Sequence, residues 1–143
     1  MEKELFWSKN MLLNHLELDE DHQSFVSIVN DMYRSYYTKD MTLADNVFER
    51  CFSFARTHFS REEAILAEIG FPDIESHQKS HQAFYKNILE FKELFLMIPQ
   101  KEERLLFVLK TADYLKSWFL GHLLGRDRVY KPYLVRLNNK KEN

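Results

Sequence analysis

The segment HFSREEAILAEIGFPDIESHQKSH, residues 58–81, carries two pairs of polar residues at helical spacing. His58 and Glu62 form an H-x-x-x-E pair, and His77 and His81 form an H-x-x-x-H pair. A Gly-Phe-Pro-Asp sequence separates the pairs, which predicts the end of one helix and the start of another. Because residues i and i+4 lie on one helix face, each pair can direct two side chains to the same place.

The rest of the chain extends this pattern. His22 follows an acidic run, and His122 and Asp127 form an H-x-x-x-x-D pair. Five of the six histidines thus join two carboxylates on four apolar stripes, where a buried polar side chain needs a partner. Seven ligands are too many for one metal ion and a suitable number for two. The candidate ligands are His22, His58, Glu62, His77, His81, His122 and Asp127.

The donor types restrict the metal. Imidazole suits first-row transition metals, and carboxylates can bridge two ions. Ca²⁺ and Mg²⁺ prefer oxygen ligands, and an iron–sulfur site would need a cysteine cluster. We therefore expect a pair of iron ions, with manganese, zinc or cobalt as substitutes. Seven protein ligands and one solvent bridge leave two six-coordinate ions short of at least one ligand, so a small molecule can bind there.

Helical periodicity predicts an all-α fold, an up-down-up-down four-helix bundle joined by short connections. The predicted helices cover residues 19–36, 43–68, 74–97 and 102–124, and the second should start with a capping box of Thr42 and Asp45. We expect a single domain over residues 1–143, with an N-terminal arm at about 1–18, the bundle at about 19–127 and a C-terminal extension at about 128–143.

The two ends of the chain carry weaker signals. Apolar residues of the arm should pack on the bundle; they are Phe6, Trp7, Met11, Leu12 and Leu13. The extension should be a short apolar continuation over 129–137, interrupted by Pro132. The last six residues, NNKKEN, are expected to be frayed and solvated.

The spacing of His122 and Asp127 conflicts with a regular helix. Five residues turn by about 500°, which would place Asp127 roughly 140° away from His122. If both side chains reach one centre, the helix must widen or end between them. We therefore predict irregular backbone between Gly121 and Asp127, because π-type distortions cluster at functional sites.

Composition excludes several other classes of function. The net charge is −2 and no basic stripe is visible, so nucleic acid is not an expected partner. The single cysteine, Cys51, excludes an internal disulfide, fits a reducing compartment and is expected to pack in the core. Neither a secretory signal nor a stretch of about 18 apolar residues is found, so we expect a cytoplasmic protein without membrane contact.

Three segments resemble the hemerythrin family in its bacterial branch: LDEDHQSF at 18–25, the segment 58–81, and WFLGHLLGRDRVYKPYL at 118–134. The resemblance covers roughly residues 6–134. It implies that one iron is held by three residues, His77, His81 and His122. The other iron is held by His22 and His58 and keeps the open position at which O₂ binds. Glu62 and Asp127 bridge both irons beside an oxo or hydroxo bridge.

One position departs from the family pattern. The family commonly has Trp-Leu four and three residues before the last histidine, whereas this chain has Trp118 and Phe119. A Phe there should change the volume of the O₂ pocket and the entry of solvent, without affecting the metal ligands. The residues expected either to line a dry O₂ pocket or to belong to the plain core are Phe25, Phe84, Trp118 and Phe119.

The ligand balance favours one function among three. Enzymes that cleave O₂ at di-iron centres use mostly carboxylates, whereas imidazoles dominate here. We therefore expect a non-enzymatic protein that binds O₂ reversibly for storage, delivery or sensing. The alternatives are a di-iron enzyme acting on peroxide, nitric oxide or ferrous iron, and a signalling module whose metal state is read by a protein partner that the sequence does not identify.

Overall fold

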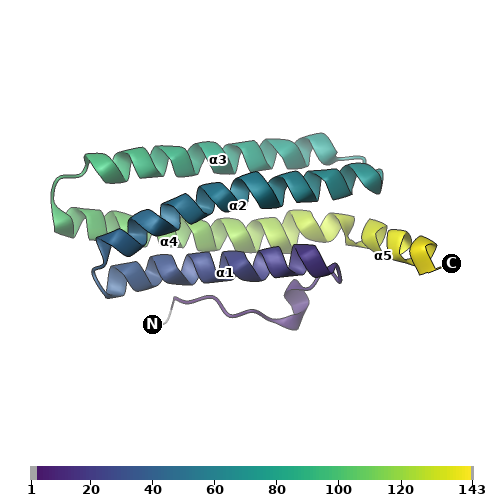
Figure 1. Ribbon diagram of the computed structural model, residues 1–143, viewed down its shortest axis with the longest axis horizontal. Helices are drawn as coiled ribbons and strands as arrows, with labels where there is room; N and C mark the ends of the chain where they lie inside the picture. Colours follow the sequence, from purple (N-terminus) through teal and green to yellow (C-terminus); the bar gives the residue numbers. More distant parts are fainter. Residues whose placement is uncertain (1–2, 143) are drawn as a thin grey trace.

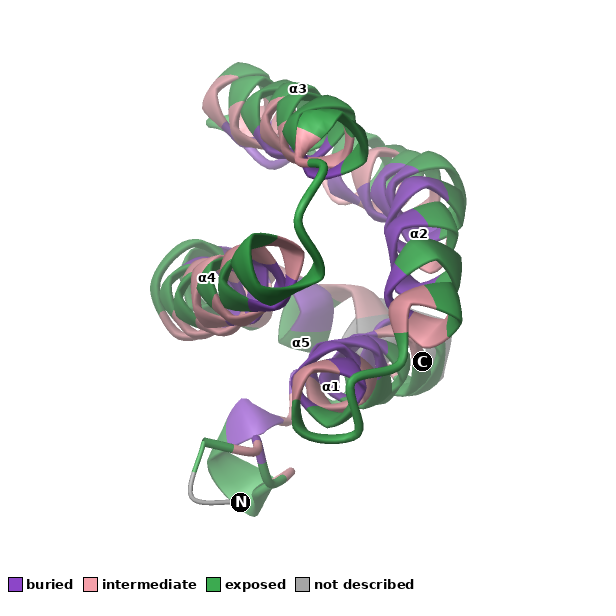
Figure 2. Ribbon diagram, turned by 90° about the vertical axis from the view of Figure 1, so that its left-hand side faces the viewer, coloured by how far each residue is buried: buried purple, intermediate pink, exposed green. Residues whose placement is uncertain are grey.

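The computed structural model describes residues 3–142, with side-chain surroundings up to Leu137. Four long helices run alternately up and down: α1 (Leu16–Tyr37), α2 (Met41–Glu68), α3 (Ile74–Met97) and α4 (Lys101–Gly121) (Figure 1). Each helix packs against the next, and α1 also packs against α4, so the four surround a common core (Figure 2). Among the described residues there is no strand, and the predicted all-α bundle is confirmed.

Two helices begin earlier than predicted because a side chain upstream caps them. The ring of His15 accepts the backbone N–H of Leu18 at 3.3 Å, so α1 starts three residues before position 19. The carboxylate of Asp40 accepts the N–H of Leu43 at 2.9 Å, and α2 starts directly after it. The predicted capping box at Thr42 is therefore wrong, since an acidic residue two positions earlier already satisfies the helix end.

The predicted connection between α2 and α3 is confirmed. Helix α2 ends at Glu68, and Gly70 has a φ of +67°, a left-handed conformation that glycine adopts without steric cost. Helix α3 covers 74–97, the range that the sequence indicates.

The end of α4 is irregular, as predicted. A π-helix, η2 (His122–Asp127), follows α4 and leads into α5 (Arg128–Glu142). Pro132 lies inside α5, so the expected interruption is wrong; a proline removes one donor and kinks a helix without always ending it. Tyr130 and Leu134 are buried on either side of Pro132 and anchor α5 to the core. The backbone of residues 138–142 is helical and not frayed, while position 143 lies outside the described residues.

The N-terminal arm packs on the bundle with only part of its apolar side chains. Leu5, Met11 and Leu13 are buried, and the backbone of Leu5 exchanges two hydrogen bonds with the side chain of Asn30. Phe6 is 76% exposed, which contradicts the prediction for this residue. Neighbouring side chains of extended backbone point to opposite sides, so the burial of Leu5 directs Phe6 outward.

The buried faces of all four helices point toward the bundle axis (Figure 2). In the half where α1 joins α2, the core is mostly apolar, with Ser35 as a buried hydroxyl, and includes Phe48, Cys51, Ile88, Phe95 and Val108. The opposite half, where α2 joins α3, also buries charged and polar side chains. Over the described part of the chain, no helix has the length and apolar character needed to cross a membrane.

Candidate metal centre

All seven predicted ligands meet at one end of the bundle. This is the end where α1 and α3 begin, α2 finishes and α4 passes into η2 (Figure 1). Each of the seven side chains is buried: His22 comes from α1, His58 and Glu62 from α2, His77 and His81 from α3, and His122 and Asp127 from η2. Four segments that are far apart in the sequence therefore supply one polar cluster.

The ligand atoms divide into two groups that share a carboxylate. In each group, every ligand atom lies within 4.8 Å of the others. The three-histidine group contains Glu62, His77, His81 and His122, and the two-histidine group contains Glu62, His22 and His58.

The two oxygens of Glu62 face different groups. Its Oε1 lies beside His77 Nε2 and 3.1 Å from His81 Nε2. Its Oε2 lies 3.1 Å from His58 Nε2 and 3.9 Å from His22 Nε2. One carboxylate therefore spans the space between the two sets of imidazoles.

Asp127 repeats this division. Its Oδ1 lies 3.0 Å from His122 Nε2 and 3.1 Å from His77 Nε2, while its Oδ2 lies 3.2 Å from His22 Nε2. The π-helix makes this position possible, because a regular α-helix would turn Asp127 away from His122 by roughly 140°. The irregular backbone is thus a requirement of the site geometry.

The cluster has the properties of a cation site. Both oxygens of Asp127 are buried, yet neither makes a correctly aligned hydrogen bond with any described group. The nearby imidazole nitrogens therefore do not direct N–H bonds at these oxygens; nitrogens and oxygens converge on shared space. Buried carboxylates without donors are costly. A cation between these atoms would satisfy them, so the residues fit a metal centre.

Electrostatics couple the carboxylates to the imidazoles. Burial alone would raise the pKa of Glu62, but the close imidazoles of His122, His58, His77 and His81 hold it well below its usual range. Burial opposes protonation of His77 and His122, yet the neighbouring carboxylates raise each pKa to about 9. Without a metal, protons on these imidazoles offset the charge of the ionised carboxylates, and metal binding must displace those protons.

A model of the hemerythrin HHE cation-binding domain matches residues 15–134, a range that includes all seven residues. The chain belongs to the hemerythrin family. A bacteriohemerythrin of Stenotrophomonas maltophilia is 23% identical over 88% of this chain and 78% of its own length. A bacteriohemerythrin of Clostridium acetobutylicum is 24% identical over 87% and 96%, and a myohemerythrin of Theromyzon tessulatum is 25% identical over 90% and 92%. The two bacteriohemerythrins support the bacterial branch.

Aromatic rings hold three imidazoles of this hemerythrin-family site in place. The stacked pairs, with the distances between their ring centroids, are Phe54 with His58 (4.6 Å), Phe59 with His81 (3.8 Å) and Trp118 with His122 (4.5 Å). Each ring covers one face of an imidazole, so it restricts rotation and keeps water from that face.

The four residues predicted for an O₂ pocket form one aromatic cluster beside the site, in which the ring of Phe25 lies 5.9 Å from that of Phe84 and 5.8 Å from that of Trp118. Phe119 contacts the two-histidine group, with its ring 6.1 Å from that of His22, and Phe25 stacks on Phe119 at 5.3 Å. Trp118 lies on the three-histidine group, and Phe84 packs against Trp118 at 4.2 Å. The geometry thus associates Phe25 and Phe119 with the group expected to bind O₂; their role in a pocket stays a prediction.

Sequence reasoning missed two polar neighbours of this hemerythrin-family site. The hydroxyl of buried Tyr130 donates to Glu62 Oε2 at 3.2 Å, and the carboxylate of Asp21 accepts from His58 Nδ1 at 2.9 Å. Tyr130 follows Asp127 by three residues, a spacing that could have indicated a shared helix face. Asp21 gave no such signal, because it acts on a residue of another helix.

Proposed function

We propose that this protein binds O₂ reversibly at a non-haem di-iron centre, for storage, delivery or sensing of O₂. The observation that carries the proposal is the division of the ligand atoms into two groups joined by both carboxylates. His77, His81 and His122 would hold one iron, and His22 and His58 would hold the other. Glu62 and Asp127 would present one oxygen to each iron.

The unequal groups support a binding position at the two-histidine iron. Three imidazoles face one carboxylate pair on one side, and two imidazoles face it on the other. The iron pair, when bound, supplies the electrons that O₂ binding requires. The protein holds the imidazoles rigidly, while Phe119 and Phe54 shield the two-histidine side from water. A ligand set rich in imidazole favours binding of O₂ over cleavage of its bond.

Anaerobic loading with Fe²⁺ tests this proposal. We expect two irons per chain, a visible charge-transfer band on addition of O₂, and loss of that band under vacuum. His58→Ala should suppress the band because it removes one ligand of the two-histidine group. His15→Ala is the matched control, since His15 caps α1 outside both groups.

Two results would contradict the proposal. An unchanged band in His58→Ala would remove the assigned role of that residue. Irreversible bleaching of the wild-type protein to the ferric form, with steady turnover of peroxide, nitric oxide or ferrous iron, would indicate a di-iron enzyme in place of an O₂-binding protein.

A further inference from the structure

The Nδ1 atoms are the outer nitrogens of the site imidazoles, on the opposite side of each ring from the Nε2 atoms that face Glu62 and Asp127. Their contacts with neighbouring side chains differ in length. His58 Nδ1 lies 2.9 Å from an oxygen of Asp21, a distance typical of a strong hydrogen bond to a carboxylate. The other Nδ1 contacts are weaker: His122 lies 3.4 Å from Ser80 Oγ, His81 lies 3.6 Å from Glu63, and His22 is buried without a partner among the described residues. The strongest outer contact therefore belongs to the two-histidine group.

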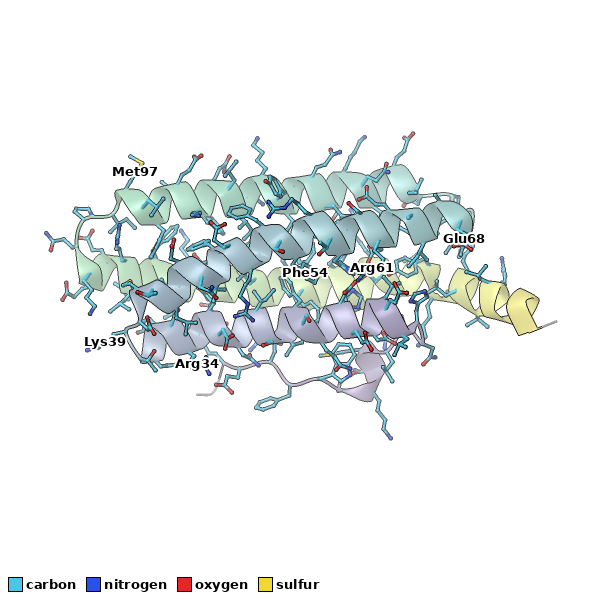
Figure 3. The ribbon with its side chains drawn as sticks, in the orientation of Figure 1. Arg34, Lys39, Phe54, Arg61, Glu68 and Met97 are labelled. Atoms are coloured by element: carbon cyan, nitrogen blue, oxygen red, sulfur yellow. The ribbon has the colours of Figure 1, made fainter. Side chains whose placement is uncertain are left out.

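Asp21 is itself fixed in place. The guanidinium of Arg61 contacts Asp21 Oδ2 at 2.5 Å and the Glu17 carboxylate at 3.3 Å. Arg61 extends from the side of α2 that faces α1, about two turns away from the labelled Phe54 and near the ligand end (Figure 3). Phe54 stacks on the face of the His58 ring while Asp21 holds its edge. One contact on the ring face and one at Nδ1 thus define the orientation of this imidazole.

The hydrogen bond between Asp21 and His58 also determines which nitrogen of His58 can bind a metal. A carboxylate accepts hydrogen bonds, so Asp21 requires the proton of His58 to be on Nδ1. The lone pair is then on Nε2, which faces Glu62 Oε2 at 3.1 Å. Carboxylate partners of this kind orient metal-binding histidines and make them stronger donors.

Asp21 lies at the boundary between the site and solvent. Its side chain is 19% exposed, whereas that of His58 is 2% exposed. Asp21 borders a groove of about 300 Å³ between α1 and α2, which is lined by hydroxyl side chains that include Ser24, Ser53 and Thr57. A substitution at Asp21 therefore opens toward this polar groove and leaves no sealed cavity in the core.

We propose that Asp21 is a positioning residue for the metal ion of the two-histidine group: it orients His58, fixes its proton on Nδ1 and strengthens Nε2 as a ligand. This inference rests on the metal centre proposed above. It implies that the two ions differ in the hydrogen bonds of their ligands as well as in ligand number. Among the described residues, only an imidazole of the two-histidine group has its Nδ1 at hydrogen-bond distance from a carboxylate.

Co²⁺ binding to the metal-free protein tests the inference without O₂ or turnover. The visible spectrum of Co²⁺ reports its coordination, and competition with a chelator gives its affinity. We expect two equivalents in the wild-type protein. Asp21→Asn should lower the affinity for one of the two Co²⁺ ions by about 10- to 100-fold, the usual effect of losing a hydrogen-bond partner of a metal ligand. Asp21→Glu, which keeps the charge, should restore part of the loss.

Asp31→Asn is the matched control. Asp31 also lies on α1, is 21% exposed and pairs with an arginine of α2, Arg50, at 2.6 Å, but no imidazole contacts it. Its variant should bind Co²⁺ like the wild type. Arg61→Gln leaves the carboxylate and removes its anchor, so it should weaken the same equivalent by a smaller factor. This variant gives an independent test if Asp21→Asn fails to fold.

The outcomes separate this inference from the proposed function. If the wild-type protein takes up two Co²⁺ and Asp21→Asn matches Asp31→Asn in affinity and spectrum, the role of Asp21 is wrong and the metal centre stands. If the folded wild-type protein takes up no Co²⁺ or Fe²⁺, the proposed centre is wrong and the role of Asp21 falls with it.

Discussion

The two halves of the bundle are built from the same four helices but have opposite cores. The half where α1 joins α2 buries apolar side chains such as Phe48, Ile88 and Phe95. The other half buries the five imidazoles and two carboxylates of the candidate metal centre, together with Asp19. A buried Phe or Ile side chain stabilises a fold by about 1.5–3 kcal/mol, whereas buried polar groups are stabilising only when they are paired. We infer that the apolar half maintains the fold, so that the polar half can keep its groups free for a metal.

The largest expected effect comes from removing Glu62, the carboxylate that the three-histidine and two-histidine groups share. Glu62→Ala should abolish binding of the iron pair, a greater loss than the roughly 10- to 100-fold caused by an outer partner. The helices should remain folded, because the apolar half is untouched. Iron per chain after desalting and far-ultraviolet circular dichroism measure the two effects.

Glu63→Ala is the control for this variant. Glu63 is the next residue of α2 and lies 3.6 Å from the outer nitrogen of His81, so its loss should leave two irons bound. Retention of two irons by Glu62→Ala would refute the central position of this carboxylate.

The converse variant weakens the fold and spares the site. Phe48 is fully buried in the apolar half, with its ring 5.3 Å from that of Phe95. Phe48→Ala should lower the free energy of unfolding by about 3–5 kcal/mol, because it leaves a cavity in the core. Urea denaturation measures this loss. The iron content of the folded fraction should not change, and the exposed Phe6→Ala should change stability by no more than about 0.5 kcal/mol. Parallel loss of iron and stability would show that the halves are coupled.

A smaller effect is expected from the hydroxyl that contacts Glu62. Tyr130→Phe removes a hydrogen bond to a charged group, which contributes about 1.5–3 kcal/mol. The variant should bind two irons, with a lower unfolding free energy and a shifted charge-transfer band. Tyr133→Phe serves as the control, since Tyr133 lies on the same helix and packs against Phe71 away from Glu62. Identical spectra for both variants would exclude an effect of the Tyr130 hydroxyl on the centre.

The parts of the structure that follow from short-range spacing were predictable. Helical periodicity gives the bundle and the bounds of α3, and the separation of His122 from Asp127 requires the distortion that appears as η2. The helix starts were less predictable, because upstream His15 and Asp40 provide the caps. Several side chains compete for that role, and the sequence does not rank them.

Contacts between helices were beyond the sequence. Asp21 is adjacent to His22 in the chain but binds His58, and Tyr130 reaches Glu62 from a helix that the sequence predicts only as a short extension. Both contacts depend on the relative rotation and height of two packed helices. A single sequence contains no period that specifies either quantity, so these partners emerge only from the packed structure.

The smallest expected effect concerns the residue that departs from the family pattern. Phe119 lies between Phe25 and the ring of His22, on the apolar side of the two-histidine group. Phe119→Leu should lower stability by about 1 kcal/mol, because the smaller side chain fills less of the same space. It should also shorten the lifetime of the oxygenated band by a few-fold, since water gains access beside His22. Phe95→Leu is the matched control: Phe95 is as buried as Phe119 but packs against Phe48 in the apolar half. If both variants lose the band at the same rate, the effect comes from general loosening of the core, and the apolar half and the O₂ side of the site are not separable at this boundary.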